Sequence, residues 1–309
     1  MKPSRHLGLM MIISGATLWG LSGPMIQWLF NRTDLSSGDY LIVRLLFAGI
    51  TILGFLLFSK HNIFEIWKHP KDWVQLCIFA LIGMLAGQYT FIETLDKSNA
   101  VTATLFQFLG PIIITIYVAA RKKKLPAPMQ LLAVVSAVLG TFYLITNGSI
   151  ENVILSKRAI LYGILTAVTF AFYTLHPKSL IKQWGTLQIV GWGMLIGGVI
   201  LWSLKRQFSF HQVAQTLTIS TFSMLILILL SGTISFLLYI GSLKHLTAIE
   251  TGLLSSIEPL VTAILSIAWL KESFGAYQLL GGVFIIVAVI LLTIPEKEFK
   301  PGVARERVS

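Results

Sequence analysis

LDKSNAVTATLFQFLGPIIIT (residues 95–115) and LKHLTAIETGLLSSIEPLVTA (residues 243–263) indicate how this chain is built. The two segments align without a gap at an offset of 148 residues, and the same offset matches Gln130-Leu131-Leu132 with Gln278-Leu279-Leu280. Within the segments the identical pairs are Leu95 with Leu243, Ala100 with Ala248, Leu105 with Leu253, and Pro111 with Pro259. A register that holds over two apolar stretches and the loop between them predicts an internal repeat.

Apolar runs of about 20 residues fill this 309-residue chain almost from end to end. A helix rises about 1.5 Å per residue, so each run is long enough to cross the roughly 30 Å hydrocarbon core of a bilayer. We therefore expect an all-α integral membrane protein with ten transmembrane helices. The expected spans are Leu7–Phe30, Tyr40–Phe58, Trp73–Glu93, Ala100–Ala119, Met129–Thr146, Ala159–Leu180, Leu187–Leu204, Thr218–Gly241, Ala248–Leu270 and Gly275–Ile294.

Composition and charge agree with a membrane protein. Hydrophobic residues make up 55% of the chain and charged residues 12%, outside the usage of soluble domains. The net charge of +11 comes from basic residues scattered over short loops and tails, which favours membrane topology over nucleic-acid binding. With the N-terminus inside, about two thirds of the 24 Lys and Arg residues fall on the cytoplasmic side. We expect a multi-pass protein of the cell membrane with both termini cytoplasmic.

The repeat predicts two inverted units. Five helices lie in residues 1–147 and five in residues 158–295, followed by a basic cytoplasmic tail over residues 296–309. Because five is odd and each crossing reverses direction, the second unit must lie upside down relative to the first. The loops agree, since RKKK (residues 121–124) follows the fourth helix and KE (residues 271–272) follows the ninth. Inverted repeats are typical of secondary transporters, which bind substrate near the middle of the membrane where the repeats meet.

Glu258 and Pro259 lie near the middle of the ninth expected helix. An ionisable residue at this depth is expensive and indicates a substrate or proton pathway, and a proline here frees a backbone carbonyl. Ser255 and Thr262 lie on the same helical face and are further candidate ligands. The structural alternative is a neutral carboxyl group that fixes the kink, with hydroxyls that bond to their own helix.

A second polar stripe lies around a proline on the fourth expected helix and consists of Thr104, Gln107, Pro111 and Thr115. Gln107 is larger than Ser or Thr and harder to satisfy within its own helix, which makes it a candidate for binding substrate. Two polar stripes on helices broken by prolines are expected to line a central cavity. The alternative is that their hydroxyls bond to their own helix or to neighbouring helices, which is the commoner arrangement.

Other candidates lie on the first three expected helices. Arg44 either takes part in binding or gating, or extends along the helix to the outer interface as an anchor or ion pair. Gln88 and Tyr89 are candidate cavity residues, and Trp19 can bind a cation through its ring or simply pack. Three further deep aromatic residues either wall the cavity or pack in the core: Tyr173, Trp192 and Tyr239.

Motifs for other kinds of chemistry are missing from the sequence. It contains no G-x-x-x-x-G-K-[ST] loop for nucleotides, no His-x-x-x-His or Glu-x-x-His pair for a metal, and no nucleophile elbow. The one cysteine, Cys77, excludes an internal disulfide and a cysteine-based metal site. We expect no cofactor, no metal and no catalytic residue.

The chain resembles the EamA family of the drug/metabolite transporter superfamily over nearly its whole length. The matching features are Leu18-Trp19-Gly20, Arg44, the link from Leu95 to Ala100, Pro111, Glu258-Pro259 and Leu270-Lys271-Glu272. The KSNAVTATLFQFLGP segment is similar to the YicL-type branch, whose members are often labelled carboxylate, amino acid and amine transporters. The resemblance implies two inverted five-helix bundles that exchange small metabolites, frequently outward. The RKKK turn departs from the family's acidic turn, so no role is carried over to that position.

The expected function is that of a secondary transporter, an exporter of an amino acid, amine or carboxylate, that works by alternating access. Glu258 is expected either to bind an amine or amino acid or to exchange a proton that couples transport. The alternatives are a membrane receptor or assembly protein without transport, and a membrane enzyme that handles lipids. The partners expected are a small-molecule substrate and the bilayer, and the sequence leaves open a monomer or a homodimer.

Overall fold

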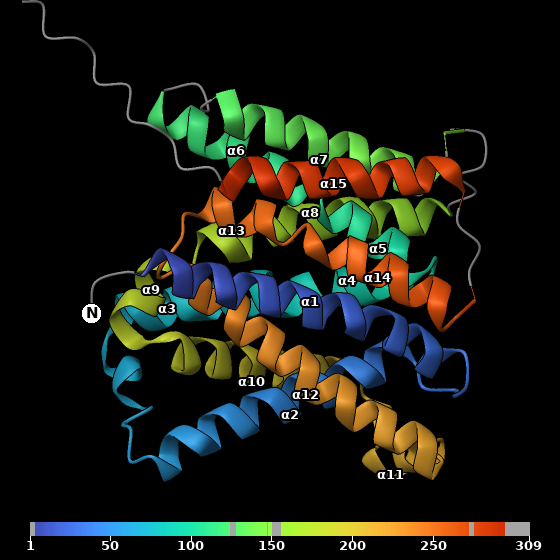
Figure 1. Cartoon of the computed structure of the whole chain (residues 1–309). Helices are drawn as coiled ribbons and strands as arrows, with labels where there is room; N and C mark the ends of the chain where they lie inside the picture. Colours follow the sequence, from blue (N-terminus) through green and yellow to red (C-terminus); the bar gives the residue numbers. More distant parts are fainter. Residues whose placement is uncertain (1–3, 124–127, 147, 150–155, 272–274, 294–309) are drawn as a thin grey trace, which may run out of the picture.

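The computed structural model describes residues 4–123, 128–146, 148–149, 156–271 and 275–293. This part of the chain is helical and contains no β-strand, so the expectation of an all-α protein is confirmed there (Figure 1). The elements are α1 (Arg5–Phe30), α2 (Ser37–Phe58), η1 (Glu65–Lys68), α3 (Pro70–Ile78), the π-helical η2 (Phe79–Ala86), α4 (Gly87–Asp96), α5 (Ala100–Gln107), α6 (Gly110–Lys122), α7 (Pro128–Thr146), α8 (Lys157–Leu175), α9 (Lys178–Trp184), α10 (Thr186–Leu204), α11 (Phe210–Gln215), α12 (Ile219–Ser242), α13 (Ala248–Leu254), α14 (Ile257–Ala268) and α15 (Ala276–Thr293).

Eight helical segments in the described part are long and apolar enough to cross a membrane. They are Arg5–Phe30, Ser37–Phe58, Pro70–Asp96, Ala100–Arg121, Lys157–Leu175, Thr186–Leu204, Ile219–Ser242 and Ala248–Ala268. The other two expected runs are occupied by α7, with 19 residues, and α15, with 18 residues. The chain is a multi-pass membrane protein, and the total of ten spans stays a prediction.

Two of these segments are interrupted near their middle. In one, α5 ends at Gln107 and α6 begins at Gly110; in the other, α13 ends at Leu254 and α14 begins at Ile257. Pro111 lies in the first turn of α6 and Pro259 in the first turn of α14. Proline fits there because its missing N–H has no partner in the first turn of a helix.

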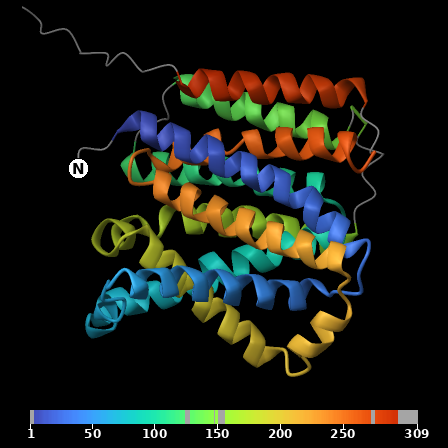
Figure 2. The same cartoon turned by 60° about the horizontal axis from the view of Figure 1, so that its bottom comes forward.

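The helices pack in pairs that follow the offset of 148 residues. Each of α2 and α7 lies against the helix equivalent to it at this offset, α10 and α15 respectively (Figures 1 and 2). Similarly, α1 packs against α12, while α8, the equivalent of α1, packs against η2 and α4, the equivalents of α12. The contacts of α1 with α14 are matched by those of α8 with α6. Packing in the described residues therefore keeps the register of the sequence repeat.

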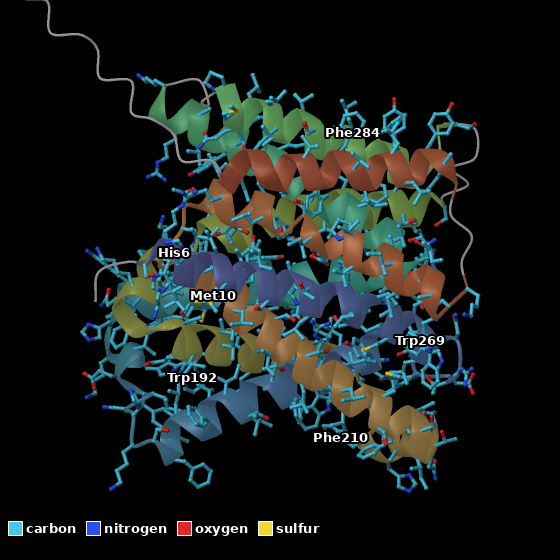
Figure 3. The ribbon with its side chains drawn as sticks, viewed as in Figure 1. His6, Met10, Trp192, Phe210, Trp269 and Phe284 are labelled. Atoms are coloured by element: carbon cyan, nitrogen blue, oxygen red, sulfur yellow. The ribbon has the colours of Figure 1, made fainter. Side chains whose placement is uncertain are left out.

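The first helix is tied to the second half of the chain at both of its ends. Near its start, Arg5 Nη2 lies 3.1 Å from Glu250 Oε1 of α13. Near its end, the Trp28 ring stacks on Trp269, just beyond α14, with ring centroids 5.8 Å apart. Figure 3 shows His6 and Trp269 toward opposite ends of the helical stack. These contacts hold α1 across the whole length of α13 and α14.

Some of the sequence expectations concern residues outside the described part. The basic tail over residues 296–309 lies there, as do Lys124 of the RKKK turn and Glu272 of the KE turn. Three short elements in the described part, η1, α9 and α11, were not expected, because each is too short to give a membrane-length apolar run.

Candidate functional site

A small cavity lies where the two interrupted helices meet helices from both halves of the chain. Its volume is about 30 Å³, which leaves room for about two water molecules. The walls come from α1, α2, α4 and α5 of the first half and from α8, α12 and α14 of the second. They are formed by Trp19, Ser22, Arg44, Gly87, Gln88, Phe91, Gln107, Tyr173, Phe236 and Glu258.

Gln107 and Glu258 meet inside this cavity. Gln107 is the last residue of α5, and its Nε2 donates a hydrogen bond of 2.9 Å to Glu258 Oε2. Glu258 is the second residue of α14, where the free N–H groups and the helix dipole favour a carboxylate. Its side chain is buried, with 1% of the residue exposed. The interruption of both helices thus places an amide and a carboxyl group against each other in the interior.

Arg44 reaches the same cavity from α2. It is buried, and its Nη1 donates to Tyr40 Oη over 3.2 Å, one turn earlier on the helix. Gly232 of α12 makes room for the guanidinium, because a Cβ at that position would lie 3.0 Å from Nη2. The side chain is therefore enclosed and does not extend to the outer interface. A guanidinium carries five N–H donors, and Tyr40 is its one hydrogen-bond acceptor among the described residues.

Gln88 of α4 is a buried amide without hydrogen bonds. It is 5% exposed, and neither its Nε2 nor its Oε1 has a partner in the described part of the chain. Leaving such a group unpaired costs about 1–3 kcal/mol, so buried amides of this kind usually have a functional reason. Because Gln88 lines the cavity, a molecule bound there can supply the missing partners.

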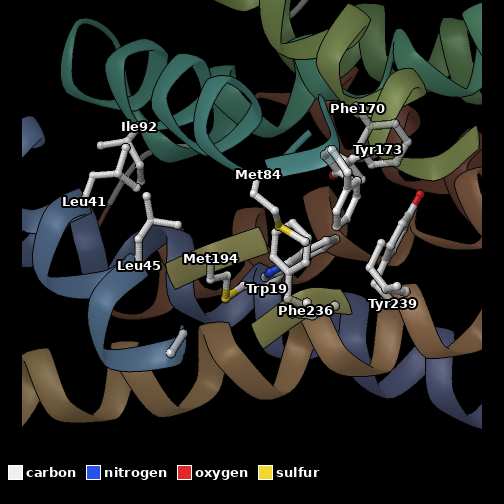
Figure 4. Packing of buried hydrophobic residues seen from close by; sticks show 14 of the residues in the cluster. Trp19, Leu41, Leu45, Met84, Ile92, Phe170, Tyr173, Met194, Phe236 and Tyr239 are labelled. Atoms are coloured by element: carbon white, nitrogen blue, oxygen red, sulfur yellow. The ribbon is translucent and has the colours of Figure 1, made fainter. Parts of the chain in front are cut away.

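Aromatic rings form most of the remaining wall. Figure 4 shows Trp19, Tyr173 and Phe236 close together in the interior, beside Tyr239. Trp19 meets Phe236 edge-on with centroids 5.1 Å apart, and Tyr173 lies 5.5 Å from Phe236. Tyr239 packs behind them, 5.0 Å from Trp19, and its hydroxyl is paired with Thr174. A ring face such as that of Trp19 attracts cations as well as apolar groups.

Four of the expected residues lie elsewhere. The Ser255 hydroxyl donates to Gly252 O over 2.7 Å, and neither it nor Thr262 lines the cavity. The Thr262 hydroxyl donates to Gly20 O over 3.2 Å, so it joins α14 to α1. Tyr89 faces a second pocket, which Glu93 and Lys205 also line. Trp192 donates its Nε1–H to Ile63 O over 3.0 Å, in a contact between α10 and the loop after α2.

The expected residues that the cavity brings together are Trp19, Arg44, Gln88, Gln107, Tyr173 and Glu258. Four other lining residues were not expected: Ser22, Gly87, Phe91 and Phe236. Ser22 and Phe91 lie three residues after Trp19 and Gln88, so helical spacing from those candidates was a usable signal. Phe236 lies three residues before the candidate Tyr239, so the same helical spacing was a usable signal there as well.

The buried carboxyl group of the cavity has no counterpart at the position equivalent to it in the repeat. At the offset of 148 residues, Gly110 is equivalent to Glu258, and Ser22 is equivalent to Phe170. A Cβ at Gly110 would lie only 2.4 Å from Phe170 Cδ1, so the ring fills the space in which a side chain would lie. Among the described residues, the site consequently contains one buried carboxyl group, supplied by the second half.

Comparison with known proteins identifies the fold and the family together. The model of the EamA-like transporter family matches this chain twice, over residues 6–146 and residues 157–294. This chain belongs to the EamA-like transporter family. The two family units of this EamA-like protein coincide with the two halves whose helices pack in equivalent pairs.

Relatives of this EamA-like chain are named as transporters. It is 36% identical to the inner membrane transporter YicL of Salmonella typhimurium, covering 95% of this chain and 97% of that one. It is 24% identical to the transporter YyaM of Bacillus subtilis, over 71% and 73% of the two chains. A solved crystal structure shares its fold with a TM-score of 0.72 at 14% identity, covering 94% of this chain and 97% of the other.

Proposed function

We propose that the protein is a secondary transporter that moves a small polar metabolite through the cavity between its halves. The observation that carries this proposal is the composition of the cavity. It holds a carboxyl group (Glu258), a guanidinium (Arg44) and an unpaired amide (Gln88), enclosed by helices of both halves. Buried groups of this kind are expensive in a membrane protein, and they are typical of a solute pathway.

Transport is proposed to occur by alternating access between two inverted repeats. The equivalent packing of helices from the two halves supports this arrangement, because symmetry-related bundles can rock about a site at their interface. The cavity of about 30 Å³ is too small for a metabolite in this state. Binding therefore requires the halves to move apart at one end. The ion pair of Arg5 with Glu250 holds α1 at one end, and the stacked rings of Trp28 and Trp269 hold it at the other.

The proposed substrate is an amino acid, an amine or a carboxylate, moved outward. The polar groups and the aromatic wall of the cavity support this range, because each of these solutes pairs a charged group with an apolar body. We place the protein in the cell membrane with both termini cytoplasmic, which is supported by the distribution of its basic residues and by a relative named as an inner membrane transporter.

Proton coupling through Glu258 is part of the proposal. The carboxyl group of Glu258 is buried. Gln107 can donate a hydrogen bond to this carboxyl group whether the carboxyl group is charged or neutral. A carboxyl group that gains a proton on one side and loses it on the other couples solute movement to the proton gradient. No cofactor is needed for such a cycle.

The test is a comparison of intracellular and extracellular metabolites in cells that express wild type, Glu258→Gln or an empty vector. Glu65→Gln is the matched control, because Glu65 is a partly exposed carboxylate of η1 that lies outside the candidate membrane spans. We expect a solute released by wild type and by the control, and not by Glu258→Gln at equal expression. Equal profiles in all cells, together with no uptake by purified protein in liposomes, would contradict a transport function.

A further inference from the structure

A second and larger pocket lies on another face of α4 from the central cavity. It is a groove of about 660 Å³ lined by η2, α4, the start of α2 and the end of α10, so both halves of the chain contribute to it. Pockets that hold small molecules are commonly about 300–1,000 Å³. Along α4, Tyr89 and Glu93 line this groove, whereas Gln88 lines the central cavity. The groove is therefore a separate place where a molecule can bind.

The apolar part of the groove faces the bilayer. Leu81 and Leu85 belong to the candidate membrane span Pro70–Asp96, and Leu201 and Leu204 belong to the span Thr186–Leu204. Leu81 is 42% exposed and Leu204 is 73% exposed, so the described part of the chain leaves them uncovered. An apolar groove within membrane spans fits an acyl chain of the bilayer, because a polar solute there would lose its hydrogen bonds to water.

The polar part of the groove lies where these helices begin or end. Lys205 directly follows α10, and its Nζ lies 2.6 Å from Asp39 Oδ1 and donates to Ser36 Oγ over 2.7 Å. An ammonium has three N–H groups, so these two contacts leave one for a further acceptor. The side chain is 33% exposed, which lets a bound molecule reach it. A phosphate oxygen is the acceptor that a lysine at the surface of a membrane meets in a phospholipid.

Glu93 supplies the opposite charge. It is 7% exposed, its Oε1 accepts a hydrogen bond from Ser37 Oγ, and its Oε2 lies 3.2 Å from Lys97 Nζ. An ionised carboxylate has about four acceptor sites, so Glu93 can accept a further N–H donor. Within the described residues, Lys205 and Glu93 are the charged side chains that line the groove. A headgroup with only negative charge would be attracted by the first and repelled by the second.

We propose that the groove binds a phospholipid with a phosphoethanolamine headgroup. Its phosphate accepts from Lys205, its primary ammonium donates to Glu93, and one acyl chain lies against Leu81, Leu85 and Leu201. A phosphocholine headgroup carries the same charges, but its quaternary ammonium has no N–H to donate. A phosphoglycerol headgroup has no positive charge to offset the repulsion of Glu93. This lipid site is independent of the solute that the central cavity takes.

The experiment measures which lipid the purified protein retains. Protein in detergent is incubated with equal amounts of dioleoyl phosphatidylethanolamine, dioleoyl phosphatidylcholine and dioleoyl phosphatidylglycerol. The lipids that stay bound after size-exclusion chromatography are identified and counted by native mass spectrometry. The first bound lipid should be phosphatidylethanolamine, enriched about ten-fold over each of the others, the factor expected for one lost charged hydrogen bond.

Paired variants test the headgroup contacts. Glu93→Gln should bring phosphatidylethanolamine to within about three-fold of phosphatidylcholine, because the ammonium loses its charged acceptor. Asp96→Asn is the matched control, since Asp96 also pairs with Lys97 and does not line the groove. Lys205→Gln should lower the retention of all three lipids about ten-fold, because they share the phosphate. Arg206→Gln, the neighbouring exposed basic residue outside the lining, should leave retention unchanged.

A further pair of variants tests the place of the acyl chain. Leu81→Trp puts a larger ring into the groove and should cause loss of the retained lipid, whichever headgroup it carries. Ile82→Trp is the control, because Ile82 is 44% exposed on the same helix and does not line the groove. Lys205→Arg keeps the positive charge and should keep the bound lipid, which a merely structural role of this position would not require. The unfolding midpoint of each variant verifies that it is folded.

The outcomes separate the headgroup from the site. Equal retention of the three lipids by wild type, or a preference for phosphatidylglycerol or phosphatidylcholine, contradicts the phosphoethanolamine assignment. Retention that is unchanged in both Lys205→Gln and Leu81→Trp places the bound lipid elsewhere and overturns the site. Wild-type protein that retains none of the three lipids overturns it as well.

Discussion

Gln107 and Glu258 are 151 residues apart in the chain, and a hydrogen bond of 2.9 Å joins Nε2 of the first to Oε2 of the second. The bond connects the end of α5 with the start of α14, so it crosses between the two halves. The repeat does not duplicate it, because the equivalents of these residues are Ser255 and Gly110. Because this contact occurs once in a duplicated fold, we expect it to serve function and not the architecture that the two halves share.

Removing the amide should destabilise the protein. Gln107→Met keeps the length of the side chain and leaves Glu258 without its donor, at an expected cost of about 1–3 kcal/mol in the free energy of unfolding. Thr104→Val is the control on the same helix, because its hydroxyl bonds only to Val101 O of its own turn. Equilibrium unfolding in mixed micelles measures the free energy of unfolding of both variants. A cost for Gln107→Met no larger than that of the control would show that the bond adds nothing to stability.

Replacing Gln88, by contrast, should not destabilise the protein. Gln88→Met removes two buried polar atoms that have no partners, so the free energy of unfolding should stay equal or rise by about 1 kcal/mol. Transport should fall at least about ten-fold if the amide contacts the solute. Gln188→Met is the matched control, because Gln188 Nε2 donates to Ile63 O and its loss should destabilise. A Gln88→Met protein with full transport would remove Gln88 from the binding site.

Glu258 should carry the proton dependence of transport. In liposomes, Glu258→Gln is expected to abolish stimulation by a pH gradient and to retain some exchange of solute at equal pH, because the uncharged amide cannot exchange a proton. Glu65→Gln should leave the stimulation unchanged. The Lys68 ammonium holds the pKa of Glu65 below its ordinary value, so this surface carboxylate stays ionised at neutral pH. A pH-gradient effect that persists in Glu258→Gln assigns coupling to another group.

The close approach of α1 to α14 depends on Gly20. A Cβ at this position would lie 2.6 Å from the backbone oxygen of Glu258, which no side-chain rotation can relieve. Gly20→Ala should therefore lower the free energy of unfolding by about 1–3 kcal/mol and reduce transport through displacement of Glu258. Gly54→Ala is the control, since no heavy atom lies within 4 Å of its added Cβ. Unfolding and exchange measured on both variants show whether the two helices must touch.

Most of the cavity residues could be predicted from the sequence, because charged and amide side chains are rare inside a membrane. Arg44, Gln88, Gln107 and Glu258 stand out against apolar surroundings, and all four line the cavity. Hydroxyl groups were less informative. Ser255 bonds to a carbonyl of its own helix, as serines and threonines in membrane helices often do, so its place in the polar stripe did not make it a lining residue.

The sequence by itself determined that the chain is helical and spans the membrane, because about 20 apolar residues in a row have no other low-energy arrangement there. It also determined the repeat, since the two halves match at a constant offset of 148 residues. Tertiary structure alone decided which polar residues meet. The bond between Gln107 and Glu258, the unpaired amide of Gln88 and the separation of Tyr89 from the cavity depend on how helices distant in sequence face one another. Helix packing sets those orientations, and the spacing within a single helix does not contain them.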